Sequence, residues 1–175
     1  MRSRMAKVIL YIIYNNREGI LYERKVQMNT PEYKRALLYR KAQGNIHRKK
    51  YVNKINSFTG EPVLDGGFLN LEDTDLIIER IKTKKVGSSL QVEINDSKEL
   101  IGFIKEKIDG IPFYLLIDEE WKFCGAYKTN GVFSECYDFD KLSSDEIRVI
   151  PCDLSFQIQI DYDNSEIECE YINYI

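Results

Sequence analysis

The sequence predicts an α+β domain, mainly an antiparallel sheet built from sequential β-hairpins with two or three helices. Short runs of β-branched and aromatic residues alternate with turn clusters along most of the chain. Two segments, residues 30–43 and 98–108, carry apolar side chains at helical spacing. The 175 residues, with 43% hydrophobic content, suit one domain with a buried core. The alternative is a boundary between two subdomains near residues 59–67, where turn signals cluster.

An N-terminal β-hairpin is expected first. Residues 7–14 are apolar, β-branched and aromatic, a composition that favours a strand. Residues 15–19 form a turn cluster, and residues 20–26 then fit the returning strand. The apolar run is too short to span a bilayer, and no small-residue cleavage site follows it. We therefore expect no targeting or membrane segment, no membrane partner and a cytoplasmic protein.

A helix is expected after the hairpin. Thr30-Pro31 combines a hydroxyl cap with a proline suited to the first helical position, so the helix should run from residue 30 to about residue 43. Gly44 is suited to end it in the left-handed conformation. Residues 45–67 show no clean period and contain several turn signals, so we expect a long loop there.

The middle of the chain should hold two more helices and a strand. Asp73 and its neighbours can cap a helix over about residues 75–83. The alternation of polarity over residues 90–94 predicts a strand. Asp96-Ser97 can cap a helix over residues 98–108, which places four apolar side chains on one face.

The C-terminal part of the chain is expected to be mainly strands. The clearest is residues 154–161, where Leu, Phe and Ile alternate with Ser, Gln and Asp. A short helix is also expected near residues 142–147. The full set of strands expected here covers residues 111–117, 121–128, 132–137, 154–161 and 166–174.

The charges are segregated along the chain. Residues 1–60 contain 14 Lys and Arg but only three acids, a net charge of +11. The other 115 residues contain 11 bases and 25 acids, a net charge of −14, and the total is −3. A basic segment with interleaved tyrosines points to a polyanionic partner. The other interpretation is that the basic and acidic segments neutralise each other inside the fold.

The first functional hypothesis is a non-catalytic binding protein whose basic N-terminal region contacts nucleic acid or a nucleoprotein, as a small accessory or inhibitor protein. Lys and Arg neutralise phosphates, and exposed aromatic rings stack on unpaired bases. No helix-turn-helix, zinc-finger or RNA-binding motif accompanies this segment. The candidate contact residues are Lys34, Arg35, Tyr39, Lys41, Arg48, Lys49, Lys50 and Lys54.

The alternative is a protein-binding inhibitor or immunity-type protein that uses an acidic C-terminal sheet against a basic partner. Period-two alternation places Glu166, Glu168 and Glu170 on one face of their strand. The competing interpretation of these charges is a solvated sheet edge that resists aggregation. The candidate partner-binding residues are Asp161, Asp163, Glu166, Glu168 and Glu170.

A metal-dependent nuclease is the second alternative. Such sites need carboxylates that converge on Mg²⁺, often with a lysine two residues after a glutamate. After Glu93 that position holds Asn95. We therefore lean toward a non-enzymatic protein and predict no catalytic residue, no metal ligand and no cofactor. The carboxylates considered are Asp65, Asp73, Asp75, Glu79 and Glu93.

The cysteines give no sign of a metal site or a reactive thiol. Cys124, Cys136, Cys152 and Cys169 lack the paired spacing of zinc ligands, and His47 is the single histidine. Each cysteine lies in or beside an expected strand, so we expect four buried, unreactive thiols.

Overall fold

The computed structural model of the protein describes residues 29–175. The hairpin expected over residues 7–14 and 20–26 lies outside the described residues. The chain divides into two compact units, residues 1–39 and 40–175. Of the first unit the structure describes the beginning of one helix. That the chain is a single domain stays a prediction.

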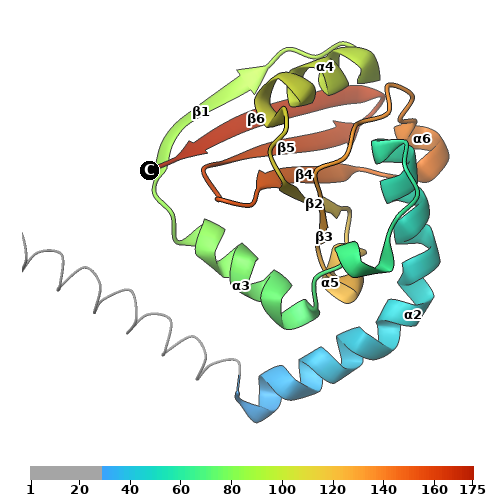
Figure 1. Ribbon diagram of the computed structural model, residues 1–175, viewed down its shortest axis with the longest axis vertical. Helices are drawn as coiled ribbons and strands as arrows, with labels where there is room; N and C mark the ends of the chain where they lie inside the picture. Colours follow the sequence, from blue (N-terminus) through green and yellow to red (C-terminus); the bar gives the residue numbers. More distant parts are fainter. Residues whose placement is uncertain (1–28) are drawn as a thin grey trace, which may run out of the picture. The chain divides into compact units, whose positions relative to one another are not determined.

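The second unit is built on a six-stranded sheet in which every neighbouring pair is antiparallel. The strand order is β1-β6-β5-β4-β2-β3 (Figure 1), so β4, β5 and β6 are neighbours both in sequence and in space. This sheet, together with its helices, confirms the predicted α+β class. The strands are β1 (Val86–Val92), β2 (Phe113–Ile117), β3 (Tyr127–Thr129), β4 (Glu146–Pro151), β5 (Phe156–Asp163) and β6 (Glu166–Tyr174).

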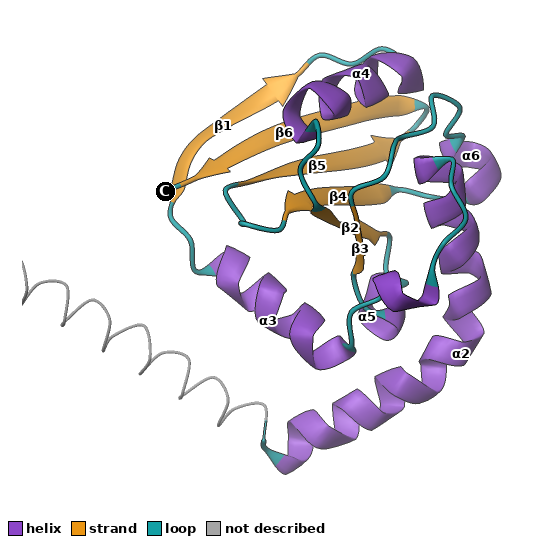
Figure 2. Cartoon of the chain, in the orientation of Figure 1, coloured by secondary structure: helices purple, strands orange, loops and turns teal. Residues whose placement is uncertain are grey.

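Helices make the longer connections between these strands (Figure 2). The cap predicted for α4 is confirmed, because the side chain of Asp96 accepts a hydrogen bond from the N–H of Glu99. In α3, Asn70 rather than Asp73 is the cap, so this helix begins earlier than expected. The helices are α2 (Pro31–Thr59), α3 (Leu71–Lys82), α4 (Ser97–Ile108), α5 (Trp121–Cys124) and α6 (Phe139–Leu142), with a 3₁₀ turn η1 (Asp65–Gly67).

One face of the sheet is covered by α4 and by the C-terminal half of α2. From α4, Phe103 stacks edge-on against Tyr171 of β6, with ring centroids 6.3 Å apart. From α2, the buried Tyr51 donates a 3.1 Å hydrogen bond to the carbonyl of Leu115 in β2. The apolar side chains of this face form the main core of the unit.

The other face is covered only in part. Ile77 and Ile81 of α3 pack in a second, smaller apolar cluster with Leu116 of β2 and Ile150 of β4. Polar and charged side chains occupy this face along β5, β6 and the start of β4, and apart from the buried Gln157 they are half-buried or exposed. The sheet therefore has one face that helices cover except along β1, and one face that is open at the end away from α3.

The long loop expected over residues 45–67 was wrong, because α2 continues to Thr59. Tyr51, Ile55 and Phe58 are all buried at the i, i+4, i+7 spacing of a helix. Gly44 does not end the helix. It lies inside it, where a methyl group would sit 2.8 Å from the carbonyl oxygen of Phe123. The glycine thus allows α5 to approach α2 closely.

Three further elements differ from expectation. Residues 121–124 form α5 rather than the start of a strand, and only residues 127–129 are extended. Residues 132–137 form no strand, and Phe133 instead stacks in the core against Phe113 at 5.0 Å. The short helix expected near residues 142–147 falls earlier, as α6, because Ser143 adopts a left-handed conformation (φ 49°) and β4 follows.

The packing of α2 gives the first testable prediction. Ile55→Ala should destabilise the fold by about 3 kcal/mol, because it leaves a cavity at a site with 0% exposure. Ile46→Ala on the same helix removes the same atoms from a side chain that is 70% exposed, and should change stability by less than about 0.5 kcal/mol. Urea unfolding of both variants checks this. Equal losses would contradict the packing described for α2.

Candidate functional site

A buried network of charged side chains joins α2 to the sheet. The ammonium of Lys54, with 0% exposure, pairs with Asp118 and lies 3.3 Å from a carboxylate oxygen of Glu120. It also donates a 3.1 Å hydrogen bond to the carbonyl of Ser143. Lys50, one turn earlier on α2, pairs with the same Glu120 at 3.0 Å. Two cations and two carboxylates therefore balance each other in this network.

Asp118 occupies a tight turn after β2, with φ at 49°. One of its carboxylate oxygens accepts hydrogen bonds from the hydroxyl of Ser144 and from the backbone N–H groups of Asp145 and Glu146, at 2.7–3.1 Å. Burial alone would raise the pKa of this carboxyl. The bonds from Lys54 and from the two N–H groups outweigh burial and hold the pKa below its ordinary value.

The contacts of this network connect α2 to two connections between elements of the sheet. The side-chain nitrogen of Lys54 donates hydrogen bonds to Asp118, to Glu120 and to the carbonyl of Ser143. The neighbouring hydroxyl of Tyr137 donates to Ser144 at 2.8 Å, and burial raises the Tyr137 pKa well above its ordinary value. The contacts of Lys54 with Asp118 and Ser143 thus hold α2 against the β2–α5 turn and the α6–β4 connection.

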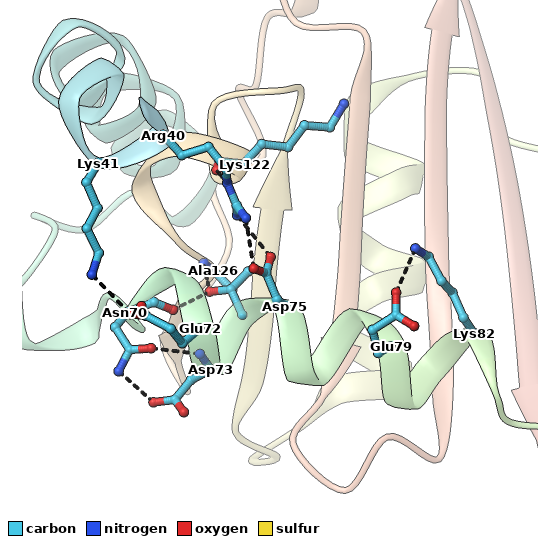
Figure 3. Close-up of polar contacts among 11 residues, drawn as sticks. Arg40, Lys41, Asn70, Glu72, Asp73, Asp75, Glu79, Lys82, Lys122 and Ala126 are labelled. Atoms are coloured by element: carbon cyan, nitrogen blue, oxygen red, sulfur yellow. Dashed lines mark hydrogen bonds and ion pairs between the residues drawn. The ribbon is translucent and has the colours of Figure 1, made fainter. Parts of the chain in front are cut away.

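Three more cations of residues 40–50, Arg40, Lys41 and Arg48, also pair with acids within the second unit. Figure 3 shows Arg40 and Lys41 reaching α3, where Arg40 forms a two-pronged ion pair with Asp75 and Lys41 pairs with Glu72 at 3.0 Å. Arg48 lies 3.4 Å above the ring of Phe68 and pairs with Asp65 at 3.2 Å. Much of the predicted basic surface is therefore neutralised locally.

The predicted nucleic-acid contacts thus separate into three groups. Lys54 is buried and committed to the internal network, so its ammonium does not face solvent. Lys41, Arg48 and Lys50 are paired with acids. The exposed remainder comprises Lys34, Arg35, Tyr39 and Lys49.

The acidic residues form a row across the open face of the sheet. Register places Asp161 of β5 directly opposite both Glu146 of β4 and Glu168 of β6. Asp163 similarly faces Glu166 across the end of the same pair of strands. All five predicted acids share this face, together with Glu146, which the sequence did not single out. We call Glu146, Asp161, Asp163, Glu166, Glu168 and Glu170 the acidic face.

Little within the second unit neutralises the acidic face. Arg148 of β4 pairs with Glu146 through a 2.5 Å hydrogen bond, and Gln159 donates to Asp161 at 3.0 Å. Among the six carboxylates, Glu146 alone has an ion pair within the described residues, and Glu170 and Asp163 accept hydrogen bonds from the neutral side chains of Ser89 and Asn164. Like charges directly opposite each other on a sheet are destabilising. The strands are also interior strands of the sheet, so protection of a sheet edge does not explain the charges.

The carboxylates considered for a nuclease do not converge. Asp65 and Asp75 pair with arginines of α2, and Glu79 pairs with Lys82 on its own helix. Within residues 29–175, no group of three or more His, Cys, Asp or Glu side chains is placed to hold a metal ion.

The expectation of four buried thiols was wrong for Cys136, which is exposed, whereas Cys169 is buried and Cys124 and Cys152 are half-buried. Cys136 lies in the segment 132–137, which is not a strand. His47 stacks on Phe123 at 4.4 Å and is not paired with a cysteine in any contact of the described residues. Burial raises the pKa of Cys124 and that of Cys169 to about 11.

No helix within residues 29–175 combines the length and apolar character that crossing a membrane requires. Comparisons of the chain with protein-family models, with curated proteins and with solved structures gave no match.

The buried network predicts a large difference between two lysines of α2. Lys54→Met should destabilise the fold by roughly 3–5 kcal/mol, because it leaves two buried carboxylates without their shared cation. Lys49→Met, the same change at an exposed position, should shift stability by less than about 0.5 kcal/mol. Thermal and urea unfolding measure both values. Similar small losses would show that Lys54 is not a structural ion.

The thiols should differ in reactivity. At a pH near 8, a pKa of about 11 leaves roughly one part in a thousand of Cys124 and Cys169 as thiolate. The exposed Cys136 should therefore account for the fast phase of labelling by a disulfide reagent in the native protein. Cys136→Ser should abolish that phase. A fast phase that survives the substitution would contradict the lower exposure described for the other three thiols.

Proposed function

We propose that this protein is a non-catalytic binding protein that captures a basic protein on its acidic face. The observation that carries the proposal is the row Glu146, Asp161 and Glu168, which runs across three interior strands of an open sheet face. A row of facing carboxylates lowers the stability of the free protein. Cationic side chains of a partner would relieve that repulsion. The free energy gained in this way would favour the complex over the free protein.

The charge balance of the second unit supports the same choice. Residues 40–175 contain 17 Lys and Arg against 25 Asp and Glu, a net charge of −8. Such a surface attracts a basic partner at long range and speeds its association. An inhibitor of a basic enzyme, such as an immunity-type protein, is the kind of molecule that fits these properties.

Contact with nucleic acid or a nucleoprotein is the second candidate. It rests on Lys34, Arg35, Tyr39 and Lys49, which are exposed on α2. An exposed tyrosine beside lysines and arginines can stack on an unpaired base while the cations bind phosphate. Fewer cations remain to bind phosphate, because acids of the same unit pair with Lys41, Arg48, Lys50 and Lys54.

The test of the proposal is a charge reversal in the middle of the row. Asp161→Lys with Glu168→Lys should weaken binding to a lysine-rich peptide and to a basic globular protein by at least about tenfold. It should also leave the fold intact or stabilise it by up to about 1 kcal/mol, since it removes like-charge opposition. Fluorescence anisotropy and urea unfolding measure the two effects.

The matched control is Glu106→Lys with Asp109→Lys, which makes the same change in net charge at exposed positions at the end of α4, outside the acidic face. It should leave binding within about twofold of the unmodified protein. Equal losses in both double variants would show a net-charge effect without a site. Tight binding of a single-stranded oligonucleotide that is lost in Lys34→Ala with Arg35→Ala would instead favour the second candidate.

A further inference from the structure

The two edge strands of the sheet differ in length and in what pairs with their outer sides. At one edge, β3 has three residues and is bridged on its outer side by Phe68, which pairs with Tyr127. At the other edge, β1 has seven residues and pairs with β6 alone within the part of the chain that the structure describes. The outer backbone groups of β1 therefore lack strand partners there.

The composition of β1 is unusual for a free edge. Its sequence, Val86–Val92, contains no charged residue and no proline, the two common means of blocking further pairing. Leu90 is 61% exposed and Val86 is 52% exposed. The register shift near Val86 is the one irregularity, and it lies at the end of the strand. Residues 88–92 thus remain a regular and open template for another strand.

We propose that β1 pairs with β1 of a second copy of this chain, as a two-fold symmetric antiparallel pair. The symmetry suits this strand because an uncharged segment meets itself without like-charge opposition. Lys84 and Lys85 precede β1 in each copy, and Glu93 follows it. Antiparallel pairing brings the beginning of one β1 beside the end of the other. The flanking charges of the two copies are therefore complementary.

Leu90 supplies the apolar part of the contact. It lies opposite Tyr171 in the β1–β6 pair, on the α4 side of the sheet, and most of its surface is in water. A pair centred near Leu90 places the two leucines against each other across the symmetry axis. The interface is small, so the dimer should be weak and dependent on protein concentration.

The experiment is sedimentation velocity of the full chain over roughly a hundredfold range of concentration. The unmodified protein should shift from monomer to dimer. Ser88→Lys with Leu90→Lys should weaken the dimer by at least about tenfold, because it places like charges across the axis. Val132→Lys, at an exposed apolar position outside the sheet, is the control and should leave the dimer unchanged.

Charge complementation makes the test independent of any loss of stability. Ser88→Glu with Leu90→Glu should also be monomeric alone, and its mixture with the lysine variant should restore a dimer of one copy of each. A protein that stays monomeric at every concentration overturns the proposal. A dimer that persists in both the lysine and the glutamate variants also overturns the proposal. A lysine variant that loses binding to the basic partner while its oligomeric state is unchanged does so as well.

Discussion

The burial of one lysine is the constraint on which the rest of the second unit depends. An ammonium with no exposure is tolerated only where carboxylates and carbonyls replace its water. Asp118, Glu120 and Ser143 do so for Lys54, and they belong to the β2–α5 turn and the α6–β4 connection. The position of α2 on the sheet is fixed by the same contacts. Once α2 covers one face, the sheet's remaining polar side chains are confined to the other.

This constraint also explains which parts of the fold the sequence could predict. The helix over residues 98–108 carries its own period and cap and was confirmed. The alternation over residues 154–161 and 166–174 predicted two strands, which are observed as Phe156–Asp163 and Glu166–Tyr174. The helical spacing of Tyr51, Ile55 and Phe58 was missed because Gly44 and a basic run precede it. A glycine that serves close packing against Phe123 looks locally the same as one that ends a helix.

The candidate sites show the same limit. That Glu166, Glu168 and Glu170 share a face follows from the period of a single strand. That Asp161 lies between Glu146 and Glu168 depends on the register of three strands, which no local pattern encodes. Lys54 was placed among the surface cations because its partner Asp118 is 64 residues away. Charge runs along a sequence therefore say little about exposure until the ion partners are known.

The structure reverses the usual distribution of charge on a sheet. Proteins commonly put charges on free edges and keep interior strands neutral where they face one another. Here the interior strands β4, β5 and β6 carry facing carboxylates, while β1, which ends the sheet within residues 29–175, is uncharged. Both departures would be relieved by the partners proposed above, a cationic protein at the acidic face and a strand at β1.

The two surfaces also have a geometric relation. A two-fold axis that pairs antiparallel strands edge to edge is perpendicular to the sheet, so it leaves the same face of each copy on the same side. In such a pair, two acidic faces lie on one side of a continuous sheet. A basic partner with two cationic patches, or two copies of it, would then meet a bivalent surface, and the second contact would form at a high effective concentration. Weak pairing through β1 and moderate affinity at each acidic face would together suffice for tight capture.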